Sequence, residues 1–198
     1  MAQAIRERTL ENINRVKNLI KIYERMKDDK DEYNTDILRA AVVLLHAALE
    51  DCLRSLSYSK LPFASSSELH KTELKVQLGK IAEYRNKTVD DLIKDVAFEY
   101  LERVTYNNSG DITKALKSLA ITLKNFDLVK LDTAIKRRHG IVHRADRIDK
   151  EEEVGKVASI QTTHVLKWVE DVERFVELLF ETQESQDNDK GVRPLNPK

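Results

Sequence analysis

The sequence has little cysteine, glycine or proline. Cys52 is the only cysteine in 198 residues, so a disulfide framework is excluded, as is usual in a reducing compartment. The 5 glycines and 3 prolines leave long stretches without a helix breaker. The N-terminus lacks an apolar signal-peptide core, and no apolar run approaches the roughly 20 residues that cross a bilayer. We therefore expect a cytoplasmic protein without a membrane segment.

Net charge is absent as well. The 34 Lys and Arg residues balance the 34 Asp and Glu residues, so no global field attracts the protein to nucleic acid. A contact with nucleic acid would have to come from a local patch. One such patch lies at residues 136–147, where Asp146 is the only acidic residue among five cations: Lys136, Arg137, Arg138, Arg144 and Arg147.

Apolar residues recur at helical spacing along nearly the whole chain, and the alternation typical of strands is absent. Asn34 or Thr35, Thr88 and Asp111 are candidate N-caps. These patterns predict an all-α fold with helices over residues 10–23, 38–56, 74–84, 88–104, 111–123, 126–139 and 157–179.

The lengths of these helices predict how the chain is organised. Four long helices would form a bundle within a single domain, residues 1–182. The shorter helices of residues 61–123 would form a helical insertion between the second and third of them. Residues 183–198 are polar and aperiodic, and we expect a disordered tail there.

The segment "KRRHGIVHRADR" carries the strongest chemical signal. In a continuous α-helix, Arg138 and His143 would point about 140° apart, because each residue turns the helix by about 100°. Gly140 lies between them, and glycine readily adopts the left-handed conformation that ends helices. We therefore expect the helix to stop near His139 and "GIVH" to turn, bringing His143 toward Arg138.

An arginine beside a histidine suits RNA chemistry. The guanidinium of Arg138 can hold two phosphate oxygens, and the imidazole of His143 can exchange a proton near neutral pH. RNA cleavage without a metal requires those two services and leaves a 2′,3′-cyclic phosphate and a 5′-hydroxyl. No glycine-rich phosphate loop or nucleophile elbow is present, so we expect no cofactor and no metal.

Two stretches resemble a known superfamily. "RRHGIVH" resembles the Arg-x4–6-His signature of the HEPN superfamily, with His139 as the polar residue that usually follows the arginine. "ILRAAVVLLHAALEDCL" is similar to the second helix of HEPN domains of the RiboL-PSP type. The resemblance covers residues 36–58 and 126–181.

The resemblance implies a helical bundle that forms a homodimer, with the two motifs meeting in a shared RNA-binding cleft. It implies that Arg138 and His143 are catalytic, that His139 assists, and that Glu50 orients the arginine from behind. Such a protein would be a metal-independent endoribonuclease, used as a toxin or phage-defence effector, with an antitoxin protein as a second partner. The RNA contacts would come from the cations around the motif: Lys136, Arg137, Arg144 and Arg147.

Other readings of the same residues stay open. The alternative within the superfamily is an inactive module that binds RNA or protein, and the 61–123 segment could cover the cleft or recruit a partner. Arg138 and His143 could also be solvated residues at a helix C-terminus, in a structural protein without an RNA role. His139 and His143 form an H-x3-H zinc pattern, but the intervening glycine and the lack of a nearby third ligand argue against a site. Glu50 could simply pair with His46 or Arg54 along a helix surface.

Overall fold

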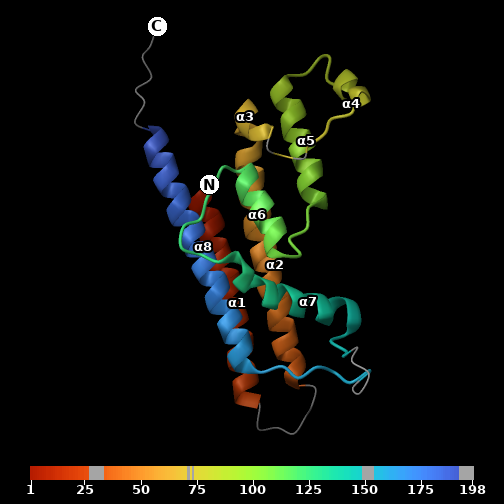
Figure 1. Ribbon diagram of the computed structural model, residues 1–198, viewed down its shortest axis with the longest axis vertical. Helices are drawn as coiled ribbons and strands as arrows, with labels where there is room; N and C mark the ends of the chain where they lie inside the picture. The colour runs from red at the N-terminus through yellow and green to blue at the C-terminus, as the bar shows by residue number, and fades with distance from the viewer. Residues whose placement is uncertain (27–33, 71, 73, 149–153, 192–198) are drawn as a thin grey trace.

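The computed structural model describes residues 1–26, 34–70, 72, 74–148 and 154–191. Three long helices lie side by side in it: α1 (Ala2–Met26), α2 (Thr35–Lys60) and α8 (Thr162–Gly191) (Figure 1). The fourth bundle element, α7 (Asp132–Arg144), is shorter and runs across the long helices (Figure 1). Within the described residues the only β-type pairing is an isolated bridge between Arg147 and Val157, so the predicted all-α class is confirmed.

The core lies between the three long helices. The apolar stripe of α2, which includes Leu38, Leu45, Leu49, Leu53 and Leu56, is buried, and each buried leucine contributes about 1.5–3 kcal/mol relative to an exposed one. At the surface, an ion pair between Lys17 and Glu173 (2.5 Å) joins α1 to α8, and one between Arg8 and Asp51 (3.0 Å) joins α1 to α2. No described helix combines the length and apolarity that a membrane crossing requires.

The segment of residues 61–123 is helical but does not follow every predicted boundary. Thr88 caps its helix through a reciprocal capping box with Asp91, as predicted. The next helix is capped by Asn108, so the prediction of Asp111 as its cap is wrong. That helix ends at Ser118 rather than Leu123, because Ala120 takes a left-handed conformation (φ 54°). The elements are η2 (Leu61–Phe63), α3 (Ser66–Leu69), α4 (Leu78–Glu83), α5 (Val89–Arg103) and α6 (Ser109–Ser118).

This segment shares the hydrophobic core of the long helices. Its buried side chains, such as Leu101, Tyr106 and Ile112, belong to the same apolar cluster as those of α1, α2 and α8. From α2, the guanidinium of Arg54 donates hydrogen bonds to the carbonyls of Leu101 and Val104 (the latter 3.1 Å). The segment of residues 61–123 is therefore built onto α2.

The last helix differs from prediction at both ends. α8 begins at Thr162, and Val157 lies before it in the bridge with Arg147. Residues 183–191 continue α8, so a disordered tail starting at residue 183 is wrong for that part; residues 192–198 lie outside the described residues. Tertiary contacts explain the extension: Gln183 is buried, and the Gln186 side chain donates to the Ala120 carbonyl (3.1 Å).

Candidate active site

Helix α7 is unbroken from Asp132 to Arg144, and Gly140 lies inside it without a positive φ. The prediction that the helix stops near His139 is therefore wrong. The left-handed stop comes at Ala145 (φ 48°) and Asp146 (φ 58°), whose backbone N–H groups both donate to the Gly140 carbonyl. A glycine inside a helix costs only about 1 kcal/mol, so contacts made further along the chain decide where α7 ends.

Those contacts centre on the Asp146 carboxylate, which is 4% exposed. Arg39 of α2 binds Asp146 Oδ2 through Nε at 2.8 Å, and Arg137 of α7 binds the same oxygen through Nη2 at 2.6 Å. Both arginines also donate to the carbonyl of Ala158, at 2.8 and 3.0 Å. This cluster of Arg39, Arg137 and Asp146, here called the aspartate hub, fastens the end of α7 to α2 and to the segment that leads into α8.

The hub gives Arg137 a structural task. Besides Asp146 and Ala158, its guanidinium donates to the Ser159 carbonyl at 3.0 Å. Its predicted role as an RNA contact is not tested by this geometry. The guanidinium of Arg137 already makes hydrogen bonds that hold the fold together. An arginine at the surface that binds RNA would not make such bonds.

Arg138 lies on a different face of α7. It shares that face with the buried Ala134 and Ile135, one turn earlier, and its own side chain is half-buried. Its guanidinium makes no hydrogen bond or ion pair with any described residue, but its charge acts on His46 of α2. Glu50, one turn along α2 from His46, acts on the same imidazole. Glu50 and Arg138 thus share His46 as an electrostatic neighbour, and the predicted orienting role of Glu50 remains a prediction.

His46 was missed as a site residue. It is 4% exposed, and neither ring nitrogen has a hydrogen-bond partner among the described residues. Burial lowers the pKa of His46, the Glu50 carboxylate opposes that shift, and the Arg138 guanidinium adds to it. The available signal was its place beside Leu45 and Leu49, within the apolar stripe of α2. The lowered pKa favours the neutral form of this buried imidazole.

His139 and His143 are exposed on another face of α7. Their rings are neighbours, with centroids 4.5 Å apart and planes at 46°. Because α7 is continuous, His143 points about 140° away from Arg138. The predicted convergence of Arg138 and His143 within one chain is therefore wrong: one protomer presents the two groups in different directions.

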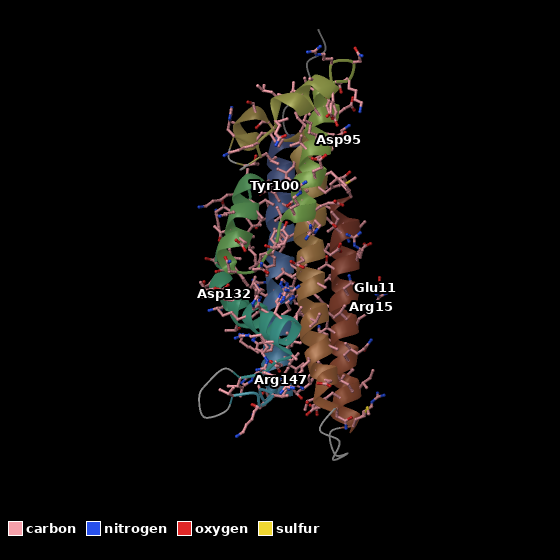
Figure 2. The ribbon with its side chains drawn as sticks, turned by 90° about the vertical axis from the view of Figure 1, so that its right-hand side faces the viewer. Glu11, Arg15, Asp95, Tyr100, Asp132 and Arg147 are labelled. Atoms are coloured by element: carbon pink, nitrogen blue, oxygen red, sulfur yellow. The ribbon has the colours of Figure 1, made fainter. Side chains whose placement is uncertain are left out.

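The remaining predicted contacts surround this face. Lys136 and Arg144 are exposed on α7, one turn before His139 and directly after His143. Arg147 lies beyond the helix, at the foot of the molecule (Figure 2), where it donates to the Gly155 carbonyl at 2.5 Å. Among the described residues, no three His, Cys, Asp or Glu side chains gather closely enough to hold a metal ion.

The sequence also matches a known protein family. Residues 10–184 match the RiboL-PSP-HEPN family, which is most of the chain. The chain belongs to the RiboL-PSP-HEPN family. No curated protein and no solved structure matches it at the significance level applied. The HEPN assignment fits a nuclease or another RNA-related function, since HEPN domains often bind RNA and dimerise.

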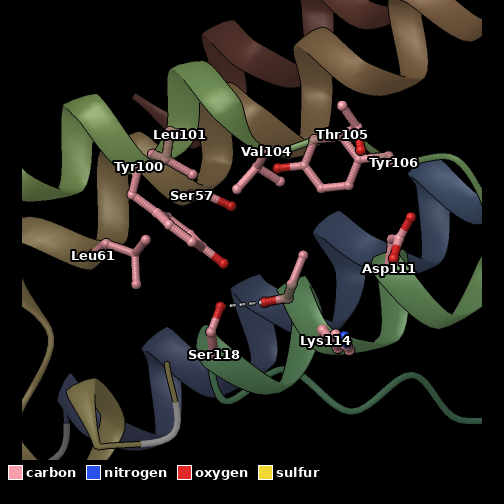
Figure 3. Close-up of a pocket in the computed structure, with 11 residues that line it drawn as sticks. Ser57, Leu61, Tyr100, Leu101, Val104, Thr105, Tyr106, Asp111, Lys114 and Ser118 are labelled. Carbon is pink, nitrogen blue, oxygen red and sulfur yellow. Dashed lines mark hydrogen bonds between the residues drawn. The ribbon is translucent and has the colours of Figure 1, made fainter. Parts of the chain in front are cut away.

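The family match also reaches beyond the two stretches that resembled HEPN domains in the sequence. Its range includes residues 61–123, the segment predicted as an insertion. Within that part of the HEPN domain, a cavity of about 210 Å³ lies between α2, α5 and α6, lined by hydroxyl groups of Ser57, Tyr100 and Tyr106 (Figure 3). None of the residues that line it lies on α7. This cavity is separate from the Arg-His motif.

Proposed function

We propose that this HEPN protein is a metal-independent endoribonuclease that works as a homodimer. The observation that carries the proposal is the placement of the motif. Arg138, unbonded by described residues, and the exposed His143 lie on one short helix whose end is fixed by the aspartate hub. A rigid helix presents both side chains with little loss of conformational entropy on binding.

The divergence of Arg138 and His143 supports a composite site. A two-fold axis would set two α7 helices face to face, so that Arg138 of one copy meets His143 of the other. Lys136 and Arg144 from both copies would then line the cleft and attract the RNA backbone. Single-stranded RNA is the favoured substrate, because its 2′-hydroxyls and bases are accessible.

In the proposed reaction, one His143 accepts the proton of the 2′-hydroxyl, and the 2′-oxygen forms a bond to phosphorus. The bond from phosphorus to the 5′-oxygen breaks, and that oxygen takes a proton from the second, protonated His143. The guanidinium of Arg138 balances the charge that builds up on the phosphoryl oxygens, and His139 assists in orienting them. The products are a 2′,3′-cyclic phosphate and a 5′-hydroxyl. A toxin or phage-defence effector restrained by an antitoxin protein is the biological role we assign to this chemistry.

The test is RNA cleavage in EDTA by purified protein, with analysis of the product ends. We expect the wild type to leave cyclic phosphates, and both His143→Ala and Arg138→Ala to lose about 10²–10³-fold in rate. His164→Ala is the matched control, since His164 is an exposed helical histidine outside the motif. Circular dichroism checks that each variant is folded.

A second function is favoured by the same divergence of Arg138 and His143. If the two groups never meet, the protein is an inactive HEPN module that binds RNA or a protein partner. This alternative predicts that neither the wild type nor any variant cleaves a broad RNA pool. RNA would still bind, and Arg138→Ala would weaken that binding.

A further inference from the structure

The continuity of α7 creates a feature beyond the proposed nuclease function. His139 and His143 are four residues apart on an unbroken helix, so their side chains lie on one face, one turn apart. Two histidines at this spacing on a helix are the arrangement that binds zinc in helical metal sites. Gly140, which argued against a metal pair in the sequence, does not interrupt the helix and so leaves the pair intact.

The ring geometry matches what one metal ion requires. A metal–nitrogen bond of about 2.0–2.1 Å places two coordinated imidazole centroids about 5 Å apart at a tetrahedral ion and about 4.5 Å apart at a right angle. The observed separation is 4.5 Å. Because both side chains are exposed, they can rotate to point one nitrogen each at a shared ion.

We propose that His139 and His143 form a two-histidine site for a borderline transition-metal cation such as Zn²⁺, Ni²⁺ or Cu²⁺. The open coordination positions face solvent, because both histidines are exposed. Imidazole nitrogen favours these ions over Mg²⁺ and Ca²⁺, which take oxygen ligands. Lys136 and Arg144 lie close and repel cations, so coordination rather than charge attraction provides the affinity.

A bound ion would have a consequence for the proposed nuclease. The nitrogen lone pair of His143 that coordinates the metal cannot take a proton from a 2′-hydroxyl. Metal occupancy therefore blocks proton transfer, and RNA and metal compete for one face of α7. This consequence rests on the proposed function, whereas the metal site itself does not.

The binding test uses tag-free protein and equilibrium dialysis against Zn²⁺ and, separately, Mg²⁺. We expect the wild type to bind Zn²⁺ but not Mg²⁺, and His139→Ala and His143→Ala each to lose about tenfold or more in affinity, because a second ligand held on the same helix acts at high effective concentration. His164→Ala, which removes an exposed histidine whose neighbour one turn along is Trp168, keeps the affinity. Affinity falls as the pH is lowered, because metal and protons compete for the imidazoles.

Two results would overturn the metal site. One is a wild type that binds no Zn²⁺ at tens of micromolar; the other is binding that survives His139→Ala and His143→Ala unchanged. Cleavage assays with added Zn²⁺ separate this inference from the nuclease proposal. If the protein binds metal but cuts no RNA, the metal site holds and the nuclease proposal is wrong. If the protein binds no metal and Zn²⁺ does not slow its cleavage of RNA, only the metal site is wrong.

Discussion

Arg137 and Arg138 are neighbours in the sequence but lie in opposite environments. Arg137 is fixed by the buried carboxylate of Asp146 and by two backbone carbonyls. Arg138 has no bond to any described residue and lies beside the buried, neutral imidazole of His46. A rotation of about 100° between successive residues is enough to separate a structural cation from one that is available to a ligand. A cluster of basic residues is therefore a poor guide to which of them binds RNA.

The largest loss of stability is expected from a change in the aspartate hub. Asp146→Asn keeps the side-chain shape and tolerates the left-handed backbone, but leaves Arg39 and Arg137 without their shared carboxylate. We expect unfolding by urea to show a loss of about 3–5 kcal/mol, because breaking a buried ion pair strands the remaining charge.

The control for this variant is Asp36→Asn. Asp36 also bonds to Arg39, but its side chain is 66% exposed, so the loss should not exceed about 1 kcal/mol. Equal losses in both variants would show that the hub has no special weight in the fold.

Replacing each of the two arginines by alanine in turn separates their roles. Arg137→Ala should cost about 1.5–3 kcal/mol in the free energy of unfolding, since it removes charge-assisted hydrogen bonds from the hub. Arg138→Ala should change that free energy by no more than about 0.5 kcal/mol, while it slows cleavage about 10²–10³-fold or, in an inactive module, weakens RNA binding. Urea unfolding and RNA assays on the same two preparations give the answer. A large stability loss in Arg138→Ala would contradict the division of roles.

The buried His46 beside Arg138 should make the stability of the protein depend on pH. Because burial lowers the pKa of His46 below its usual 6.5, the unfolded chain takes up a proton at a pH where the folded protein does not. Above pH 6.5 the imidazole is neutral in both the folded and the unfolded protein, and this contribution to stability is complete. As the pH falls below 6.5, the free energy of unfolding decreases by up to about 1.4 kcal/mol for each unit by which folding lowers the pKa.

The measurement is urea unfolding between pH 7.5 and 4.5. His46→Leu should remove this part of the acid sensitivity, while the exposed His164→Leu should retain it. Identical pH curves for wild type and His46→Leu would show that His46 does not contribute.

A small gain in stability is expected at Gly140. An alanine there adds a Cβ that lies 3.9 Å from Asp146 Oδ1, an ordinary contact, and removes the entropy cost of glycine in a helix. Gly140→Ala should stabilise the protein by about 0.5–1 kcal/mol and keep cleavage intact. Destabilisation, or loss of activity in a folded protein, would instead support a turn at this glycine.

Local patterns predicted most of the fold. The apolar stripe of α2 and the capping box at Thr88 depend on residues within a few positions of each other, and both are confirmed. The end of α7 depends on Arg39, more than a hundred residues away in the chain, and no local pattern could reveal it. A useful signal was nevertheless present, since a single acidic residue, Asp146, within a basic segment indicates an internal ion pair.

The candidate site divides in the same way. The residue types of the motif could be read directly, and they led to RNA as the expected substrate class, which stays a prediction. The directions in which Arg138 and His143 point could not, because they depend on whether Gly140 continues the helix. His46 escaped notice because a histidine with a glutamate four residues on is typical of an exposed helix surface.

The position of α8 in the chain has a consequence for biosynthesis. α8 supplies one wall of the core, including Phe175 and Phe180, and it follows the other described helices in the chain. Until it emerges from the ribosome, the apolar faces of α1 and α2 that it covers stay exposed to water and to other nascent chains. The segment that anchors α7 leads directly into α8. During translation, the hub that orients the Arg-His motif can therefore form only after residues 158 and 159 have been synthesised.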